Sequence, residues 1–212
     1  MLQVKICGIT CVEQGQAIAQ MGATALGYIC VPRSPRYIAV DAIAPIAAAI
    51  PGVDHFGVFA NAPLANMVSI TKTAGLTAIQ LHGDETLATC QRLRNALNHA
   101  SLDIKLVKAF RVRSAKDLET ALTYEHSVDT LLLDAYHPDQ LGGTGHTLNW
   151  QGLKAFSPTR PWFLAGGLNP DNIRSALAQL SPNGIDLSSG VERSPGDKDL
   201  VKVRRLFEQL KA

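Results

Sequence analysis

The sequence predicts a (β/α)8 barrel that forms one compact domain over residues 1–212. Three observations favour it. Eight short apolar runs could form strands, segments with helical spacing separate most of them, and the strand ends recur about every 20 to 30 residues, enough for a strand, a helix and two loops. An open doubly wound sheet has the same local pattern, but eight units in a row favour closure.

The expected strands are short runs of β-branched and other apolar residues, the composition typical of buried strands. In chain order they are Val4–Cys7, Ala25–Ile29, His55–Phe59, Ala78–Leu81, Leu106–Phe110, Leu131–Asp134, Trp162–Ala165 and Ile185–Leu187.

The expected helices carry apolar residues at helical spacing. They are Glu13–Met21, Leu64–Ala74, Glu85–Asn98, Ala115–Leu122 and Lys198–Leu210. Gly22 and Gly75 follow the first two, where a glycine commonly ends a helix. Asn169 followed by Pro170 is typical of a helix cap and first turn.

Composition limits the possible functions. Hydrophobic residues make up 46% of the chain and charged residues 18%, which excludes intrinsic disorder. A net charge of +2 is too balanced for a protein that mainly binds nucleic acid. No run has the length and apolar character of a membrane span. We therefore expect neither nucleic acid nor a membrane as partner, and a monomer.

The four cysteines, at positions 7, 11, 30 and 90, do not have the spacing of a zinc site. We expect reduced thiols and a cytoplasmic location, because disulfides are rare in the cytosol.

In a barrel, chemistry is located at the C-terminal ends of the strands. Cys7 ends the first expected strand and could act there as a thiolate base or nucleophile. The alternative is a small buried hydrophobic side chain. Asp134 follows three leucines, where a carboxylate is costly to bury without a task or a partner. Its alternatives are a helix cap or an arginine partner.

Two further strand ends carry polar candidates. After the second strand, Arg33 and Arg36 lie in a proline-containing loop. A guanidinium fits a carboxylate or phosphate, and Arg33 is better interpreted as a solvated residue. His82 follows the fourth strand and could bind substrate or transfer protons, although a single histidine is more often structural.

Small residues follow the last two strands, where barrels commonly hold phosphate. Glycines let backbone N–H groups converge on an anion, and a following helix adds a favourable dipole. The expected phosphate-binding residues are Gly166, Gly167, Ser188, Ser189 and Gly190. A further glycine-rich segment, 142–145, could close over a substrate or form an ordinary turn; it lacks the P-loop pattern.

These motifs together resemble a known family. The run Lys5-Ile6-Cys7-Gly8-Ile9-Thr10 is similar to the opening signature of the phosphoribosylanthranilate isomerases of tryptophan biosynthesis. Collinear similarity continues through segments 34–37, 57–59, 80–84, 132–134, 142–145, 165–172 and 186–192. Small departures occur at Cys11 and over Val12–Gln14.

The resemblance implies a cofactor-free, metal-free Amadori isomerase, an aldose–ketose isomerase whose small-molecule substrate is a phosphosugar joined to anthranilate. It implies that Cys7 is the general base and Asp134 the general acid, and that Arg36 binds the anthranilate carboxylate. We also assign His82 and Asp186 to substrate binding.

Two alternative functions fit the same barrel. A related barrel isomerase of histidine biosynthesis performs the same chemistry, but it would be expected to carry Asp rather than Cys on the first strand. A non-catalytic phosphometabolite-binding or redox-sensing barrel would use Cys7 and Cys11 as switch thiols, and would not require Asp134 and Arg36 together.

Overall fold

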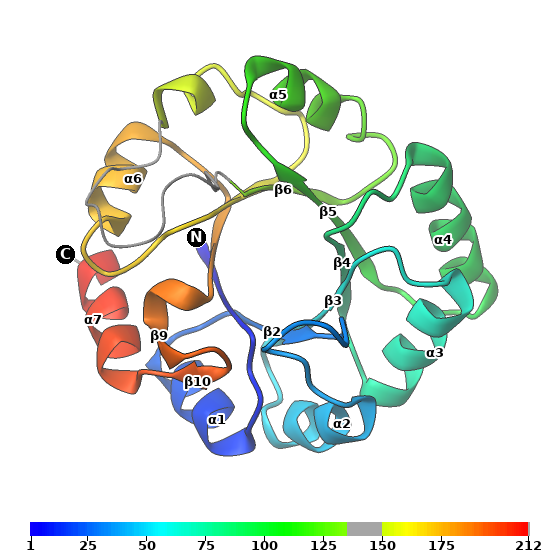
Figure 1. The fold of residues 1–212 in the computed structure, drawn as a ribbon, viewed down its shortest axis with the longest axis horizontal. Coiled ribbons are helices and arrows are strands. Elements are labelled where there is room, and N and C mark those ends of the chain that lie inside the picture. Colours follow the sequence, from blue (N-terminus) through cyan, green and yellow to red (C-terminus); the bar gives the residue numbers. More distant parts are fainter. Residues whose placement is uncertain (135–149, 212) are drawn as a thin grey trace.

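A computed structural model describes residues 1–134 and 150–211. Within them, eight parallel strands form a closed barrel in sequential order, with helices around the outside (Figure 1). This confirms the predicted barrel and excludes the open sheet. The barrel strands are β1 (Gln3–Cys7), β2 (Ala25–Ile29), β3 (Asp54–Phe59), β4 (Ala78–Leu81), β5 (Lys105–Arg111), β6 (Thr130–Asp134), β7 (Trp162–Ala165) and β8 (Gly184–Leu187).

The barrel closes between its first and last strands. Strand β1 pairs in parallel with β8, and Lys5 lies opposite Asp186 in this register. Closure therefore brings together two side chains that are 181 residues apart in the sequence.

The described residues form seven α-helices. They are α1 (Val12–Met21), α2 (Val40–Ala49), α3 (Leu64–Ala74), α4 (Leu87–His99), α5 (Ala115–Leu122), α6 (Ile173–Gln179) and α7 (Leu200–Lys211). Helix α2, which is rich in alanine and contains Pro45, was not predicted. Its weak polar face and internal proline hide the helical pattern, although Ile43 and Ile46 are buried against the barrel.

Two expected helix starts were early by two residues. Glu85 and Lys198 precede α4 and α7 rather than opening them. Both side chains are buried in ion pairs: Glu85 Oε2 lies 3.2 Å from Lys108 Nζ, and Lys198 Nζ lies 2.6 Å from Glu192 Oε1. Tertiary partners therefore override the helical pattern at both positions.

The expected cap at Asn169 is also displaced. Helix α6 begins at Ile173, with Asn172 as its N-cap. Asn169 still caps the turn that leads into the helix, because its Oδ1 accepts from the Asp171 and Asn172 N–H groups at 2.8 and 3.2 Å and its carbonyl oxygen accepts from the Ile173 N–H at 3.1 Å.

The chain also forms short elements that were not predicted. Strands β9 (Glu192–Ser194) and β10 (Asp197–Lys198) pair antiparallel in a small hairpin after β8, beside α1 in Figure 1. Two 3₁₀ helices are η1 (Trp150–Leu153) and η2 (Ser189–Val191).

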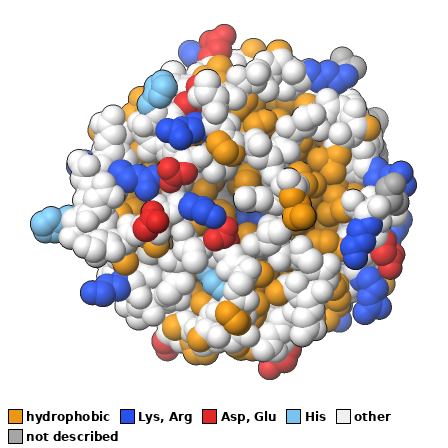
Figure 2. Space-filling view, turned by 180° about the vertical axis from the view of Figure 1, so that it is seen from behind, with side chains coloured by type: hydrophobic (Ala, Val, Ile, Leu, Met, Phe, Trp, Pro, Cys, Tyr) orange, Lys and Arg blue, Asp and Glu red, His pale blue; other side chains and the backbone are white. Residues whose placement is uncertain are grey.

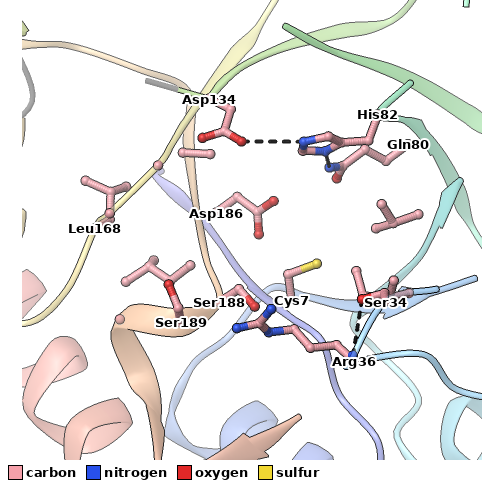
Figure 3. Close-up of a pocket in the computed structure, with 17 residues that line it drawn as sticks. Cys7, Ser34, Arg36, Gln80, His82, Asp134, Leu168, Asp186, Ser188 and Ser189 are labelled. Carbon is pink, nitrogen blue, oxygen red and sulfur yellow. Dashed lines mark hydrogen bonds and ion pairs between the residues drawn. The ribbon is translucent and has the colours of Figure 1, made fainter. Parts of the chain in front are cut away.

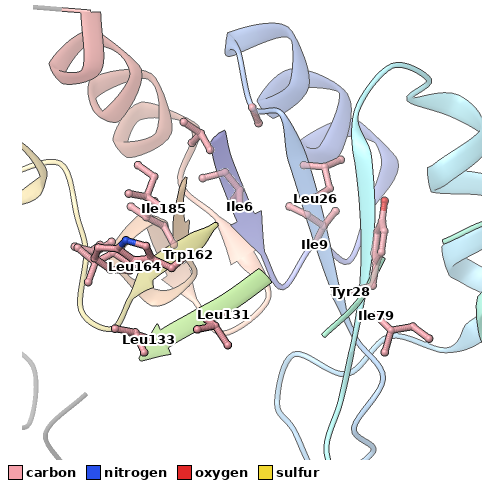
Figure 4. Packing of buried hydrophobic residues seen from close by; sticks show 14 of the residues in the cluster. Ile6, Ile9, Leu26, Tyr28, Ile79, Leu131, Leu133, Trp162, Leu164 and Ile185 are labelled. Carbon is pink, nitrogen blue, oxygen red and sulfur yellow. The ribbon is translucent and has the colours of Figure 1, made fainter. Parts of the chain in front are cut away.

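Alternation along each strand separates two hydrophobic layers. Val4 and Ile6 of β1 pack outward in the large cluster between barrel and helices, part of which Figure 4 shows. A second cluster of buried residues fills the interior of the barrel. Its members are Ala25, Phe56, Ala78, Val107, Ala109, Leu132, Phe163 and Ala165. Lys5 and Cys7 have the opposite parity to Val4 and Ile6, so they point into the barrel above this apolar layer.

The face shown in Figure 2 carries basic and acidic side chains close to one another. Among the described helices, none has the length and apolar character needed to cross a membrane.

Candidate active site

A cavity of about 250 Å³ opens at the C-terminal ends of the strands (Figure 3). The ten residues predicted as catalytic, substrate-binding or phosphate-binding all line it, although their roles stay predictions. These residues are Cys7, Arg36, His82, Asp134, Gly166, Gly167, Asp186, Ser188, Ser189 and Gly190.

Cys7 ends β1 inside the barrel. Gly8 follows with φ +81°, a left-handed conformation that glycine adopts without strain and that turns the chain away from the strand. Burial raises the pKa of the Cys7 thiol, while the neighbouring Lys5 and Lys198 ammonium groups act in the opposite direction without cancelling it. Burial therefore favours the protonated form of the free thiol, and the two ammonium groups favour the thiolate.

Asp134 ends β6 across the cavity. His82, just after β4, has its Nε2 3.4 Å from Asp134 Oδ2, and its Nδ1 lies 3.1 Å from Gln80 Nε2. Asp134 is partly exposed and faces the cavity (Figure 3). Among the described residues, Asp134 therefore has a histidine neighbour rather than an arginine partner, and the chain that follows it, which a helix cap would involve, lies outside those residues.

Arg36 reaches the cavity from the loop after β2. Its Nε and Nη2 donate to both carboxylate oxygens of Glu192 on β9, at 2.7 to 3.0 Å. This bidentate pair holds the planar guanidinium in one orientation. Arg33 is exposed and does not line the cavity, in agreement with its interpretation as a solvated residue.

The loops after β7 and β8 pack directly against each other. A Cβ added to Gly190 would lie 1.9 Å from the Leu168 carbonyl oxygen, so only glycine permits this approach. Gly166 and Gly167 have φ of +93° and +65°. Behind Ser188, the buried Lys198 Nζ lies 3.5 Å from Ser188 Oγ. Small residues of both loops therefore line this end of the cavity, and the lysine behind them is paired with Glu192 at 2.6 Å.

Comparison with known proteins identifies the family. The model of the family described as "N-(5'phosphoribosyl)anthranilate (PRA) isomerase" matches residues 4–209. This chain belongs to that family. The isomerase of that name from Crocosphaera subtropica is 58% identical over 211 residues, covering 99% of both chains. The one from Nostoc punctiforme is 56% identical, covering 99% of this chain and 98% of the relative.

Solved structures of the PRA isomerase family share the fold. The Thermotoga maritima enzyme superposes with a TM-score of 0.90 at 35% identity, covering 100% of this chain and 99% of that one. The Thermus thermophilus enzyme gives 0.83 at 33%, covering 99% and 98%. A structure named as a complex with reduced 1-(o-carboxyphenylamino)-1-deoxyribulose 5-phosphate gives 0.84 at 32%, covering 100% and 99%.

Sequence reasoning missed four polar residues that shape this PRA isomerase-family cavity: Lys5, Gln80, Glu192 and Lys198. Lys5 is fully buried and donates to Asp186 Oδ2 at 2.7 Å. Burial disfavours its charge, but the Asp186 carboxylate and Cys7 outweigh burial, so the pKa of Lys5 is raised. One signal was available: a lysine at i−2 from Cys7, within an apolar strand, must point to the same side as Cys7.

Segment 142–145, a candidate for closing over substrate, lies outside the described residues. In the parts of the chain that the structure does describe, no three His, Cys, Asp or Glu side chains cluster as metal ligands would.

Proposed function

We propose that this chain isomerises N-(5'-phosphoribosyl)anthranilate to 1-(2-carboxyphenylamino)-1-deoxyribulose 5-phosphate in tryptophan biosynthesis, with Cys7 as general base and Asp134 as general acid. The family match over residues 4–209 supports the reaction. The observation that carries the assignment of roles is that the thiol of β1 and the carboxyl of β6 line one cavity.

The proposed chemistry divides into two proton transfers. Asp134 gives its proton to the furanose ring oxygen as the C1–O bond breaks, and the anthranilate nitrogen and C1 form an iminium. The iminium withdraws electrons and makes the C2 hydrogen acidic. Cys7 removes that proton, and the resulting enolamine tautomerises to the C2 ketone. Because the iminium serves as the electron sink, this route uses no cofactor.

The electrostatics of the cavity support Cys7 as a base that is activated on binding. Burial keeps the pKa of its thiol raised in the free protein. Lys5 and Lys198 already favour the thiolate, and a cationic iminium beside it would favour the thiolate further. The two roles require that the pair Cys7 and Asp134 hold one proton between them, with the carboxyl protonated and the thiol ionised when the reaction begins.

Substrate binding is proposed to follow the cavity from end to end. Arg36 pairs with the anthranilate carboxylate, and His82 and Asp186 contact the sugar. The phosphate binds the backbone between the loops after β7 and β8, at Gly166, Gly167, Ser188, Ser189 and Gly190. A planar carboxylate matches the guanidinium, and convergent amides match a phosphate.

A direct isomerase assay on the purified protein tests this proposal. We expect turnover of phosphoribosylanthranilate, and rescue of a tryptophan auxotroph that lacks only this step. The aminoimidazole carboxamide substrate of the histidine-pathway isomerase serves as the comparison. Turnover of that substrate alone, or of neither, would contradict the proposal.

A monomer in the cytoplasm completes the proposal. All four cysteines are free, which suits a reducing compartment, and charges of both signs are mixed on the face in Figure 2. Sedimentation equilibrium at micromolar concentration checks the monomer.

A further inference from the structure

A fully buried ammonium group lies beneath the cavity. Lys5 Nζ donates to Asp186 Oδ2 at 2.7 Å and to Gln80 Oε1 at 2.9 Å, and it lies 5.4 Å from the centroid of the Phe56 ring. An ammonium has three donors and no acceptor. Lys5 can therefore face only oxygen on Gln80, never its amide nitrogen.

This constraint determines which way the Gln80 amide points. The two ends of a carboxamide have nearly the same shape, but Oε1 must face Lys5, so Nε2 must face away from it. Nε2 lies 3.1 Å from His82 Nδ1. Because the amide nitrogen only donates, Nδ1 must accept, and a neutral His82 carries its proton on Nε2.

That nitrogen is the one that faces Asp134. His82 Nε2 lies 3.4 Å from Asp134 Oδ2 (Figure 3), a separation that is long for a hydrogen bond and that substrate binding can shorten. The result is one directed series of contacts along the cavity, from Asp186 through Lys5, Gln80 and His82 to Asp134. It links strands β8, β1, β4 and β6.

We propose that Gln80, oriented by Lys5, is a positioning residue that fixes the Nε2–H tautomer of His82 and so directs an N–H toward Asp134; this rests on the proposed role of Asp134 as general acid. A donor on Oδ2 leaves Oδ1 as the oxygen that carries the acid's proton. It also stabilises the carboxylate that remains once the proton has moved to the substrate.

The nitrogen resonances of the His82 ring test the proposal directly, because they distinguish a protonated from an unprotonated nitrogen. We expect the neutral His82 ring of the wild-type protein to carry no proton on Nδ1 and one on Nε2, with the signals assigned by their loss in His82→Asn. His55 is an internal reference, since its Nδ1 lies 2.9 Å from the Tyr28 hydroxyl and its Nε2 3.1 Å from the Ile50 carbonyl oxygen. A wild-type His82 protonated on Nδ1 overturns the proposal, whether or not any variant folds.

Gln80→Glu supplies the second measurement. The new carboxylate keeps an oxygen for Lys5 but offers a second oxygen to Nδ1, which must then bear a proton. We expect Nδ1 to become protonated, the His55 signals to stay in place, and kcat to fall at least about tenfold, up to the roughly 10²–10⁴-fold that loss of a general acid costs. KM should change by a smaller factor than kcat, because the N–H directed at Asp134 matters most as the proton leaves the acid.

The exposed Gln91 of α4 provides the matched control, since Gln91→Glu makes the same change of charge away from the cavity. We expect its kcat and its His82 resonances to equal those of the wild type. A Gln80→Glu protein with unchanged His82 protonation and wild-type kcat refutes the positioning role. A wrong assignment of Asp134 as the acid can be distinguished from a wrong role for Gln80. In the first case Asp134→Asn would keep the wild-type kcat, while the His82 nitrogen resonances would still report the tautomer.

Discussion

Arg36 Nε lies 2.9 Å from Glu192 Oε1, and Arg36 Nη2 lies 2.7 Å from Glu192 Oε2. The β9–β10 hairpin therefore holds the guanidinium at the cavity. This pairing uses the Nε–Nη2 edge, so a substrate carboxylate would bind the other edge of the guanidinium. Glu192 is itself fixed, because it also accepts from Lys198 Nζ at 2.6 Å and from the Gly196 N–H at 3.1 Å.

Arg36→Met should raise KM with a smaller effect on kcat. A charge-assisted contact is worth about 1.5–3 kcal/mol, or roughly 10- to 150-fold in KM, if it is equally strong in ground and transition states. Glu192→Gln keeps the shape but weakens the hold on Arg36, so its KM should rise less. Steady-state kinetics measure both. An unchanged KM in Arg36→Met would assign the carboxylate to another group, with Arg33 the next candidate.

Cys7→Ser should fold and lose most of its activity. A hydroxyl is far too weakly acidic to act as a base near pH 7, and removal of a general base costs about 10²–10⁴-fold in kcat. Cys11→Ser is the matched control and should be close to wild type, because Cys11 does not line the cavity. Near wild-type kcat in Cys7→Ser would remove Cys7 from its role.

Asp134→Asn separates binding from chemistry. The amide keeps the shape of the side chain but cannot supply the proton, so kcat should collapse by about 10²–10⁴-fold while KM stays near its wild-type value. Calorimetry of the binding of reduced 1-(o-carboxyphenylamino)-1-deoxyribulose 5-phosphate, an analogue of the product, checks that the cavity remains intact. Normal kcat in this variant would leave the acid unidentified.

Gly190→Ala tests the contact between the two small-residue loops. Its Cβ would lie 1.9 Å from the Leu168 carbonyl oxygen, so the loops must separate, at a cost of about 1–3 kcal/mol in unfolding free energy. Inhibition by inorganic phosphate should weaken and KM should rise. The control is Gly152→Ala, since a Cβ at Gly152 would meet no atom of the described residues within 4 Å. Equal phosphate inhibition in Gly190→Ala and wild type would locate the anion elsewhere.

Burial lowers the pKa of His55, which gives the stability a pH dependence of known sign. The unfolded chain protonates this ring near its ordinary pKa of about 6.5, and the folded chain does so only at lower pH. The contribution of neutral His55 to the free energy of unfolding is therefore fully present above about pH 6.5, and it is lost progressively as the pH falls below that value. Urea unfolding of wild type and His55→Gln from pH 8 to pH 5 should show the difference between them shrinking toward low pH. A constant difference would contradict this.

Local pattern was sufficient to predict the barrel and the position of the cavity. Eight apolar runs gave the eight strands within a residue or two, because buried strands differ strongly in composition from the loops around them. In a closed parallel barrel, the residues that end the strands converge at one mouth. Order along the chain therefore predicts which side chains share the cavity, as Cys7 and Asp134 do.

Elements with a weak or interrupted pattern escaped prediction. Helix α2 contains a proline and little polar contrast, and the β9–β10 hairpin is too short for any period to register. The helix starts at Glu85 and Lys198 were misplaced because each residue suits a helix locally but forms a buried ion pair instead.

By itself, the sequence determined the fold, the polar residues at the strand ends and the family resemblance, since these depend on local composition and order. Only the tertiary structure decided how those residues are held. Gln80 meets Lys5 across 75 residues, Glu192 meets Arg36 across 156, and Asp186 meets Lys5 across 181. The physical reason is that barrel closure and the β9–β10 hairpin bring these partners together. Periodicity and composition describe only neighbouring residues, so they do not predict a contact between residues that are far apart in the chain.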